Sequence, residues 1–163
     1  MICDGATPDE ARQSIHDAVV KWGWSLMTVQ ADPPDESWTY TIGLTAFDHP
    51  EVVIVSVGQE TAGALLDALG ERVRHGDRFD TATGTVVDGA PVGLLPVHPV
   101  HVERGLLDAW IDYYQGFGEG EPEPRAIQVI VPDWFFCADH AASQPILASP
   151  DAQMRSLGVT PPE

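Results

Sequence analysis

The sequence predicts an α+β fold in which a mixed, mainly antiparallel sheet has about three helices packed against it. Segments with strand patterning outnumber those with helix patterning, and the two kinds do not alternate regularly, as they would in a fold built from βαβ units. The only tight connection is Asp88-Gly89, which predicts a two-residue hairpin between 85–87 and 92–95. We expect residues 1–150 to form a single domain of ordinary size and residues 151–163 to form a flexible tail.

The amino-terminal part of the chain predicts one helix followed by three strands. The helix follows Thr7 and ends at Gly23, because apolar residues between them recur every three or four positions. These apolar residues are Ala11, Ile15, Ala18 and Trp22. The strands should cover residues 24–30, 38–44 and 52–57.

The second and third of these strands differ in their expected burial. Alternation along 38–44 places Trp38, Tyr40, Ile42 and Leu44 on one face of the sheet. By contrast, the segment 52–57 is a nearly continuous β-branched run. Such a run is typical of a central strand that is covered on both faces.

The second half of the chain predicts two more helices and a last strand. The first of these helices ends before Gly76, a residue suited to the position just after a helix. The next should run from about Glu103 to Gln115, where apolar side chains share one helical face. Residues 126–131 predict a further buried strand.

The charge of the chain restricts its partners. The chain has 8 Lys and Arg against 25 Asp and Glu, which gives a net charge of −17. Phosphate backbones and anionic lipid would repel such a surface, so we expect neither nucleic acid nor a membrane as a partner. The negative surface either maintains solubility or docks on a basic partner protein.

Two further observations favour a cytoplasmic protein. The two cysteines, Cys3 and Cys137, are too few for a disulfide framework. The first residues are polar and acidic, unlike a signal peptide, and no apolar run approaches the roughly 20 residues that span a bilayer.

Candidate catalytic residues lie next to the strand 38–44. His49 and Glu51 precede the following strand with a spacing of two, so in an extended chain they share a face and Glu51 could orient His49 as a general base. The alternative is that His49-Pro50 forms a turn and Glu51 is a solvated strand entry. Tyr40 and Thr41 are candidate ligand-binding residues on opposite faces, and Gly43 would allow a ligand or another backbone to approach closely.

Three more polar residues are candidates for ligand binding. Gln128 lies within the last apolar strand, and Asp133 follows its end. A buried amide must find hydrogen-bond partners, so Gln128 either ties down a neighbouring loop or contacts a ligand. Gln144 follows the aromatic run 134–136, which could form a pocket wall or part of an ordinary core.

The sequence leaves open whether the chain binds a metal. His98 and His101, together with Cys137 and His140, supply four residue types that bind zinc, but their spacing matches no established zinc motif. No P-loop, dinucleotide fingerprint or nucleophile elbow is present either. The sequence therefore leaves the cofactor unknown.

Several short motifs follow one another along the chain. These motifs are Cys3-Asp4-Gly5, Gly23-Trp24, Trp38-Thr39-Tyr40-Thr41-Ile42-Gly43-Leu44-Thr45, His49-Pro50-Glu51, Gly76-Asp77, Gln128-Val129-Ile130-Val131-Pro132-Asp133 and Gln144-Pro145-Ile146-Leu147. Their order resembles the bacterial family called domain of unknown function 4262. The resemblance covers most of the chain, and it implies a small cytoplasmic bacterial protein of unassigned activity. It implies no catalytic residues.

Two functions remain open from the sequence. The first is a small-molecule-binding domain, with or without enzymatic activity, because polar side chains recur at the ends of otherwise apolar strands. The alternative is an acidic protein-interaction module, of the immunity-protein or antitoxin type, that masks a basic partner.

Overall fold

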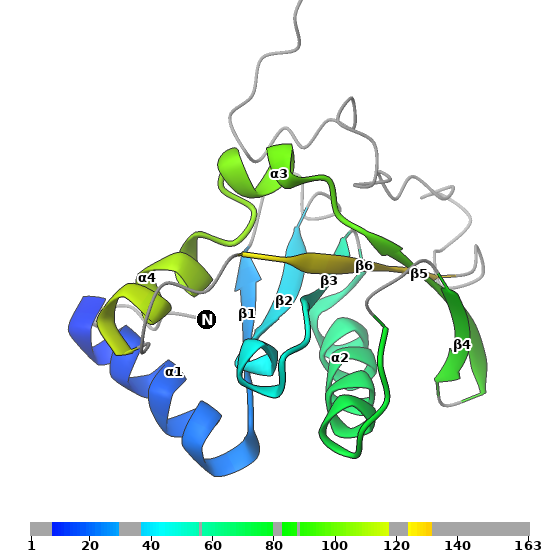
Figure 1. Ribbon diagram of the computed structural model, residues 1–163, viewed down its shortest axis with the longest axis horizontal. Helices are drawn as coiled ribbons and strands as arrows, with labels where there is room; N and C mark the ends of the chain where they lie inside the picture. The colour runs from blue at the N-terminus through cyan, green and yellow to red at the C-terminus, as the bar shows by residue number, and fades with distance from the viewer. Residues whose placement is uncertain are drawn as a thin grey trace, which may run out of the picture.

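The computed structural model describes residues 8–29, 37–55, 57–79, 83–87, 89–117 and 124–131 (Figure 1). The helices are α1 (Pro8–Trp22), α2 (Gln59–Arg74), α3 (Pro99–Glu103) and α4 (Asp108–Phe117), with a short 3-10 helix η2 (Leu44–Phe47). The strands are β1 (Ser25–Val29), β2 (Trp38–Ile42), β3 (Glu51–Val55), β4 (Thr83–Val87), β5 (Ala90–Pro96) and β6 (Ala126–Ile130). The predicted limit at residue 150 and the tail 151–163 lie outside the described residues.

The six strands form one sheet in the order β1-β2-β3-β6-β5-β4. Only β3 and β6 pair in parallel, with Glu51 opposite Ala126, and all other neighbours are antiparallel. This sheet, with three helices of ordinary length and the short α3, confirms the predicted α+β class.

Helices cover both faces of the sheet. On one face, α2 packs its apolar side through Leu65, Leu66 and Leu69. On the other face, α1, α3 and α4 contribute Ile15, Val102 and Trp110 to a second core cluster (Figure 1). The sheet is therefore the middle layer of three.

The strand β3 is the buried central strand that its composition predicts. Val52 and Ile54 pack in the cluster under α2, whereas Val53 and Val55 pack in the cluster under α1 and α4. All four side chains are fully buried. Successive side chains of a strand point to opposite faces, so a strand covered on both sides has no polar face.

The prediction that Leu44 lies on the same face of the sheet as Trp38, Tyr40 and Ile42 is wrong. Trp38, Tyr40 and Ile42 share a face, but Leu44 packs in the opposite cluster. The chain leaves the extended conformation at Gly43, which has a φ of 132°. A strand's alternation cannot continue through that turn, so Leu44 begins the 3-10 helix η2 instead.

The helix predicted over 103–115 is present as α4, but it begins at Asp108 rather than at about Glu103. The chain ends α3 at Glu103 and restarts α4 at Asp108. Gly105 between them has a φ of 107°, a left-handed conformation that interrupts a helix. The interruption leaves Leu106 and Leu107 fully buried in the turn.

The predicted hairpin is confirmed. The antiparallel ladder of β4 and β5 brings Val87 opposite Ala90, so two residues connect the strands. Gly89 has a φ of 83°, which is the conformation that such tight turns require.

Candidate functional site

The connection between β2 and β3, residues 43–50, contains His49 and lies between Thr41 at the end of β2 and Glu51 at the start of β3. Gly43 starts it, and a Cβ on Gly43 would lie 2.6 Å from the carbonyl oxygen of Gly23 and 2.8 Å from the Cα of Trp24. The sequence allows either a ligand or another backbone to approach Gly43 closely. The structure shows the approach of another backbone, at Gly23 and Trp24. Asp48 ends the connection with a φ of 56°.

Glu51 is the centre of this connection. Its side chain is fully buried, and its carboxylate oxygens accept six hydrogen bonds. The donors are the hydroxyls of Thr41 (2.8 Å) and Thr45 (2.6 Å), the backbone N–H groups of Gly43 (3.2 Å), Leu44 (3.0 Å) and Thr45 (3.0 Å), and the indole N–H of Trp110 (3.1 Å). Three successive N–H groups that converge on an oxyanion form a nest of the kind that binds anions in other proteins.

Burial and hydrogen bonding act in opposite directions on Glu51. Complete burial is the larger effect and leaves the pKa of the Glu51 carboxyl above its ordinary value, although the hydrogen bonds from Thr45, Thr41 and Gly43 oppose it. The backbone and indole N–H groups can only donate, so the surroundings complement an ionised carboxylate. Glu51 is therefore an internal anion that holds the connection in place.

His49 is engaged in the same way by backbone groups. Its Nδ1 lies 2.7 Å from the carbonyl oxygen of Pro50, and its Nε2 accepts a hydrogen bond of 2.9 Å from the N–H of Phe79. These partners require the neutral tautomer that carries its proton on Nδ1. The side chain is fully buried and fastens the connection to the segment after α2.

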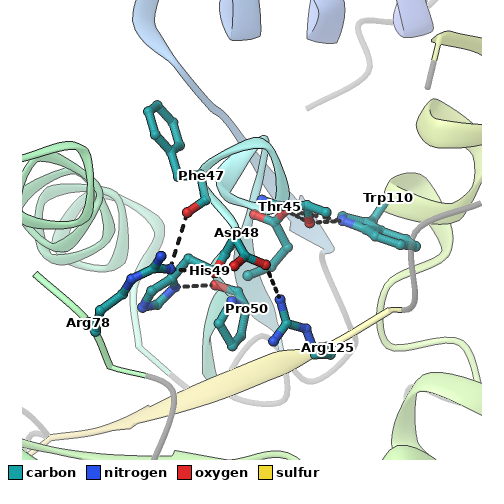
Figure 2. Close-up of polar contacts among 9 residues, drawn as sticks. Thr45, Phe47, Asp48, His49, Pro50, Arg78, Trp110 and Arg125 are labelled. Carbon is teal, nitrogen blue, oxygen red and sulfur yellow. Dashed lines mark hydrogen bonds and ion pairs between the residues drawn. The ribbon is translucent and has the colours of Figure 1, made fainter. Parts of the chain in front are cut away.

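Two arginines flank the outer part of the connection (Figure 2). The guanidinium of Arg78 donates to the carbonyl of Phe47 at 3.1 Å and to the carbonyl of Asp48. Arg125, just before β6, lies 3.7 Å from the carboxylate of Asp48. The Arg125 side chain is 46% exposed and that of Asp48 is 91% exposed, so this ion pair faces solvent.

The remaining predicted ligand-binding residues are dispersed. The Tyr40 hydroxyl accepts a hydrogen bond of 3.0 Å from the N–H of Ala109, in the first turn of α4, and burial raises the pKa of Tyr40. Thr41 also accepts from the N–H of Val52 at 2.9 Å. Gln128 is fully buried in β6, on the sheet face opposite that of Ile127. Asp133 and Gln144 lie outside the described residues.

The structure thus brings Thr41 and Glu51 into contact, whereas the His49 side chain bonds to Pro50 and Phe79. Tyr40 and Gln128 lie elsewhere. The side chains of His49 and Glu51 bind different partners. Catalytic roles for His49 and Glu51, and ligand binding by the other five residues, stay predictions.

Sequence reasoning missed Thr45, Trp110 and Arg125. Thr45 and Trp110 bond both to Glu51 and to each other, with 3.0 Å between the indole nitrogen and the Thr45 hydroxyl. The apolar face of the helix predicted over 103–115 indicated only that Trp110 is a core residue. Its indole N–H, which needs a partner when buried, was the one signal of a polar role.

Two cavities lie at opposite parts of the described fold. The β6 cavity, of about 380 Å³, lies at the amino ends of β3 and β6 and reaches the start of α3. The α1–α2 cavity, of about 530 Å³, lies beside the first residues of β1. None of Tyr40, Thr41, His49, Glu51 and Gln128 lines either cavity.

The described residues contain no group of three or more His, Cys, Asp and Glu side chains placed to hold a metal ion. The Nδ1 atom of His98 accepts from the N–H of Val100 at 3.2 Å and so caps α3. His101 is fully buried in that helix. Cys137 and His140 lie outside the described residues.

The described helices include none that is both long enough and apolar enough to cross a bilayer.

Fold and site together define a small α+β protein with a mixed six-stranded sheet and an internal carboxylate at its β2–β3 connection. The chain belongs to the family of the domain of unknown function DUF4262, whose family model matches residues 18–134. No curated protein and no solved structure gives a significant match.

Proposed function

We propose that this chain is a small-molecule-binding domain whose ligand occupies the β6 cavity. The volume of about 380 Å³ falls within the range of roughly 300–1,000 Å³ that is usual for ligand sites. The lining is mainly apolar, and four of its residues are prolines: Pro50, Pro96, Pro99 and Pro124. Prolines give the cavity rigid walls that lose little entropy when a ligand binds.

The charged groups at the β6 cavity favour a ligand with a carboxylate. Arg125 lines the cavity, and a guanidinium can bind a carboxylate through two parallel hydrogen bonds. Its 3.7 Å pairing with the exposed Asp48 is weaker than such a bidentate contact. Glu103 also lines the cavity and opposes a second negative charge. A small monocarboxylic acid with an apolar body fits these features best.

The proposal concerns binding rather than catalysis. Both ring nitrogens of His49 and both carboxylate oxygens of Glu51 are committed to hydrogen bonds within the chain. Any acid–base role of this pair would require those bonds to open. Instead, the two side chains fix the position of Pro50, which lies between them and forms part of the cavity wall.

The test compares acids with their neutral amides. Benzoate and indole-3-acetate should raise the midpoint of thermal unfolding and shift backbone amide signals near Arg125, whereas benzamide and indole-3-acetamide should not. Arg125→Gln should remove the effect. Asp48→Asn is the matched control, because it breaks the same ion pair but leaves the guanidinium, so binding should persist or strengthen. Equal binding of acids and amides, or unchanged binding by Arg125→Gln, would rule the proposal out.

The excess of acidic residues favours a second candidate, the acidic protein-interaction module. The chain holds 25 acidic residues against eight basic ones. The segments 30–36 and 118–123 each carry three acidic residues and no basic one. A basic partner should co-purify in a fixed ratio at about 50 mM salt and be lost at about 500 mM salt, since the Debye length shortens. Retention after neutralising Glu119, Glu121 and Glu123 would speak against those charges as the contact.

A further inference from the structure

The α1–α2 cavity has a lining that differs in kind from that of the β6 cavity. Its lining residues come from the end of α1, the start of β1 and α2. Figure 1 shows these three elements. Two indoles, Trp22 and Trp24, contribute to its walls, and Asp67 and Glu71 contribute two carboxylates. No proline and no basic residue lines it.

The two indoles are held differently. Trp24 is buried, because its ring packs on Gly70 of α2, where a Cβ would lie 2.7 Å from the ring. Its N–H donates to Asp67 Oδ1 at 3.0 Å, which fixes the ring's orientation. Trp22 is 58% exposed, which is unusual for so large an apolar side chain. The cavity therefore combines a fixed aromatic wall with an accessible one.

The carboxylates leave negative charge at the cavity. Asp67 and Glu71 are four residues apart on α2, so they occupy the same face of that helix. Glu71 is neutralised by Arg74, at 2.8 Å. Asp67 forms no ion pair with any described basic residue, and its only hydrogen bond there comes from the neutral indole of Trp24. Its charge is thus available to a ligand.

Both indoles already interact with cations of the chain itself. The Lys21 ammonium lies 4.9 Å from the centroid of the Trp22 ring, and the Arg74 guanidinium lies 5.9 Å from that of Trp24. Indole faces attract cations through their negative electrostatic potential, and sites for quaternary ammonium groups are commonly built from such rings. The wall is therefore suited to positive rather than negative ligands.

We propose that the α1–α2 cavity is a binding site for a small organic cation, a protonated amine or quaternary ammonium that carries an apolar group. The cation would lie against the Trp22 ring and pair with Asp67, while the apolar group would contact Leu26 and the Trp24 ring. An anion would face two carboxylates, and a neutral ligand would leave Asp67 without a counter-charge. This site is independent of the proposed function, which concerns the β6 cavity.

The test uses phenethylammonium and choline as probes, with 2-phenylethanol as the neutral counterpart of the first. Titration followed by NMR should shift the indole N–H signals of Trp22 and Trp24, and 2-phenylethanol should bind at least tenfold more weakly than phenethylammonium. Asp67→Asn should weaken binding of both cations at least fivefold, because the amide oxygen can still accept from Trp24 while the charge is lost. The matched control is Glu60→Gln, which removes an exposed charge of α2 that does not line the cavity, and it should change neither affinity.

Three results would overturn the proposal: equal affinity for phenethylammonium and 2-phenylethanol, an unchanged affinity in Asp67→Asn, or no shift of either indole signal with both cations. Binding of a lysine-rich peptide without binding of either small cation would also overturn it, in favour of a protein partner. Arg125→Gln should leave binding of the cations intact, so failure at one cavity is distinguishable from failure at the other.

Discussion

At the scale of single residues, the main result is that the buried carboxylate of Glu51 occupies an anion-binding group of N–H donors in its own chain. A nest of N–H groups at residues 43–45 would attract a ligand's phosphate or carboxylate if it were open, but Glu51 fills it. The sequence interpretation treated Glu51 as a partner for His49 or as a solvated residue. Neither alternative describes the observed contacts, because the donors come from β2, from the loop that follows it and from α4.

Replacing Glu51 tests this role. In Glu51→Gln the charge is lost, and the amide nitrogen must face N–H and hydroxyl groups that donated to the carboxylate. Buried donors without acceptors cost about 1–3 kcal/mol, and more when the lost partner was charged. We therefore expect the free energy of unfolding to fall by about 3 kcal/mol, measured by urea denaturation.

Glu60→Gln provides the reference for Glu51→Gln, because Glu60 is an exposed glutamate in the first turn of α2. The same chemical change there should alter the free energy of unfolding by no more than about 0.5 kcal/mol. Equal effects of the two substitutions would mean that the six hydrogen bonds of Glu51 contribute little.

At the scale of elements, the sequence predicted those helices, strands and turns that depend on local residue patterns. The hairpin of β4 and β5 follows from Asp88-Gly89, and the buried β3 follows from its β-branched run. The start of α4 was predicted about five residues too early, because the left-handed conformation of Gly105 interrupts the chain between α3 and α4. For the candidate site, Thr41, His49 and Glu51 were found from local spacing. Trp110 was not, because its contact with Glu51 joins residues 59 positions apart.

The helix α2 allows a matched prediction, since it contains two glycines in different surroundings. At Gly63 a Cβ would meet only a methyl of Leu26 at 3.5 Å, an ordinary contact. Alanine is favoured over glycine within a helix by about 1 kcal/mol, so Gly63→Ala should raise the free energy of unfolding by about 0.5–1 kcal/mol.

At Gly70 the same substitution should have the opposite sign. The new Cβ would lie 2.7 Å and 2.8 Å from ring atoms of Trp24, which is packed too tightly to move without cost. We expect Gly70→Ala to lower the free energy of unfolding by about 1–2 kcal/mol, despite the gain in helix propensity. Thermal unfolding of both variants would show this, and a stabilised Gly70→Ala would mean that the indole does not lie against α2.

At the scale of the whole molecule, net charge should affect stability more than individual ion pairs do. The chain carries −17, and its side-chain ion pairs within the described residues, such as Arg12 with Asp112, lie at the surface. Surface pairs contribute little, whereas like charges distributed over a compact molecule repel one another.

Salt should therefore stabilise this protein. Raising sodium chloride from about 10 mM to about 500 mM shortens the Debye length from roughly 30 Å to a few ångströms and screens the repulsion. We expect the midpoint of thermal unfolding to rise by several degrees at constant pH. A fall over this range would show that attractive pairs outweigh the repulsion.

The position of β6 has a consequence for how the chain acquires its structure. Among the strands that the structure describes, β1, β2 and β3 form one half of the sheet and β4 and β5 the other, and β6 alone joins the two halves. Its parallel partner β3 lies 75 positions earlier in the sequence, so a long loop must close before they meet. On the ribosome, the first five strands emerge before β6. Until it inserts, both halves present an unpaired edge that chaperones would have to shield.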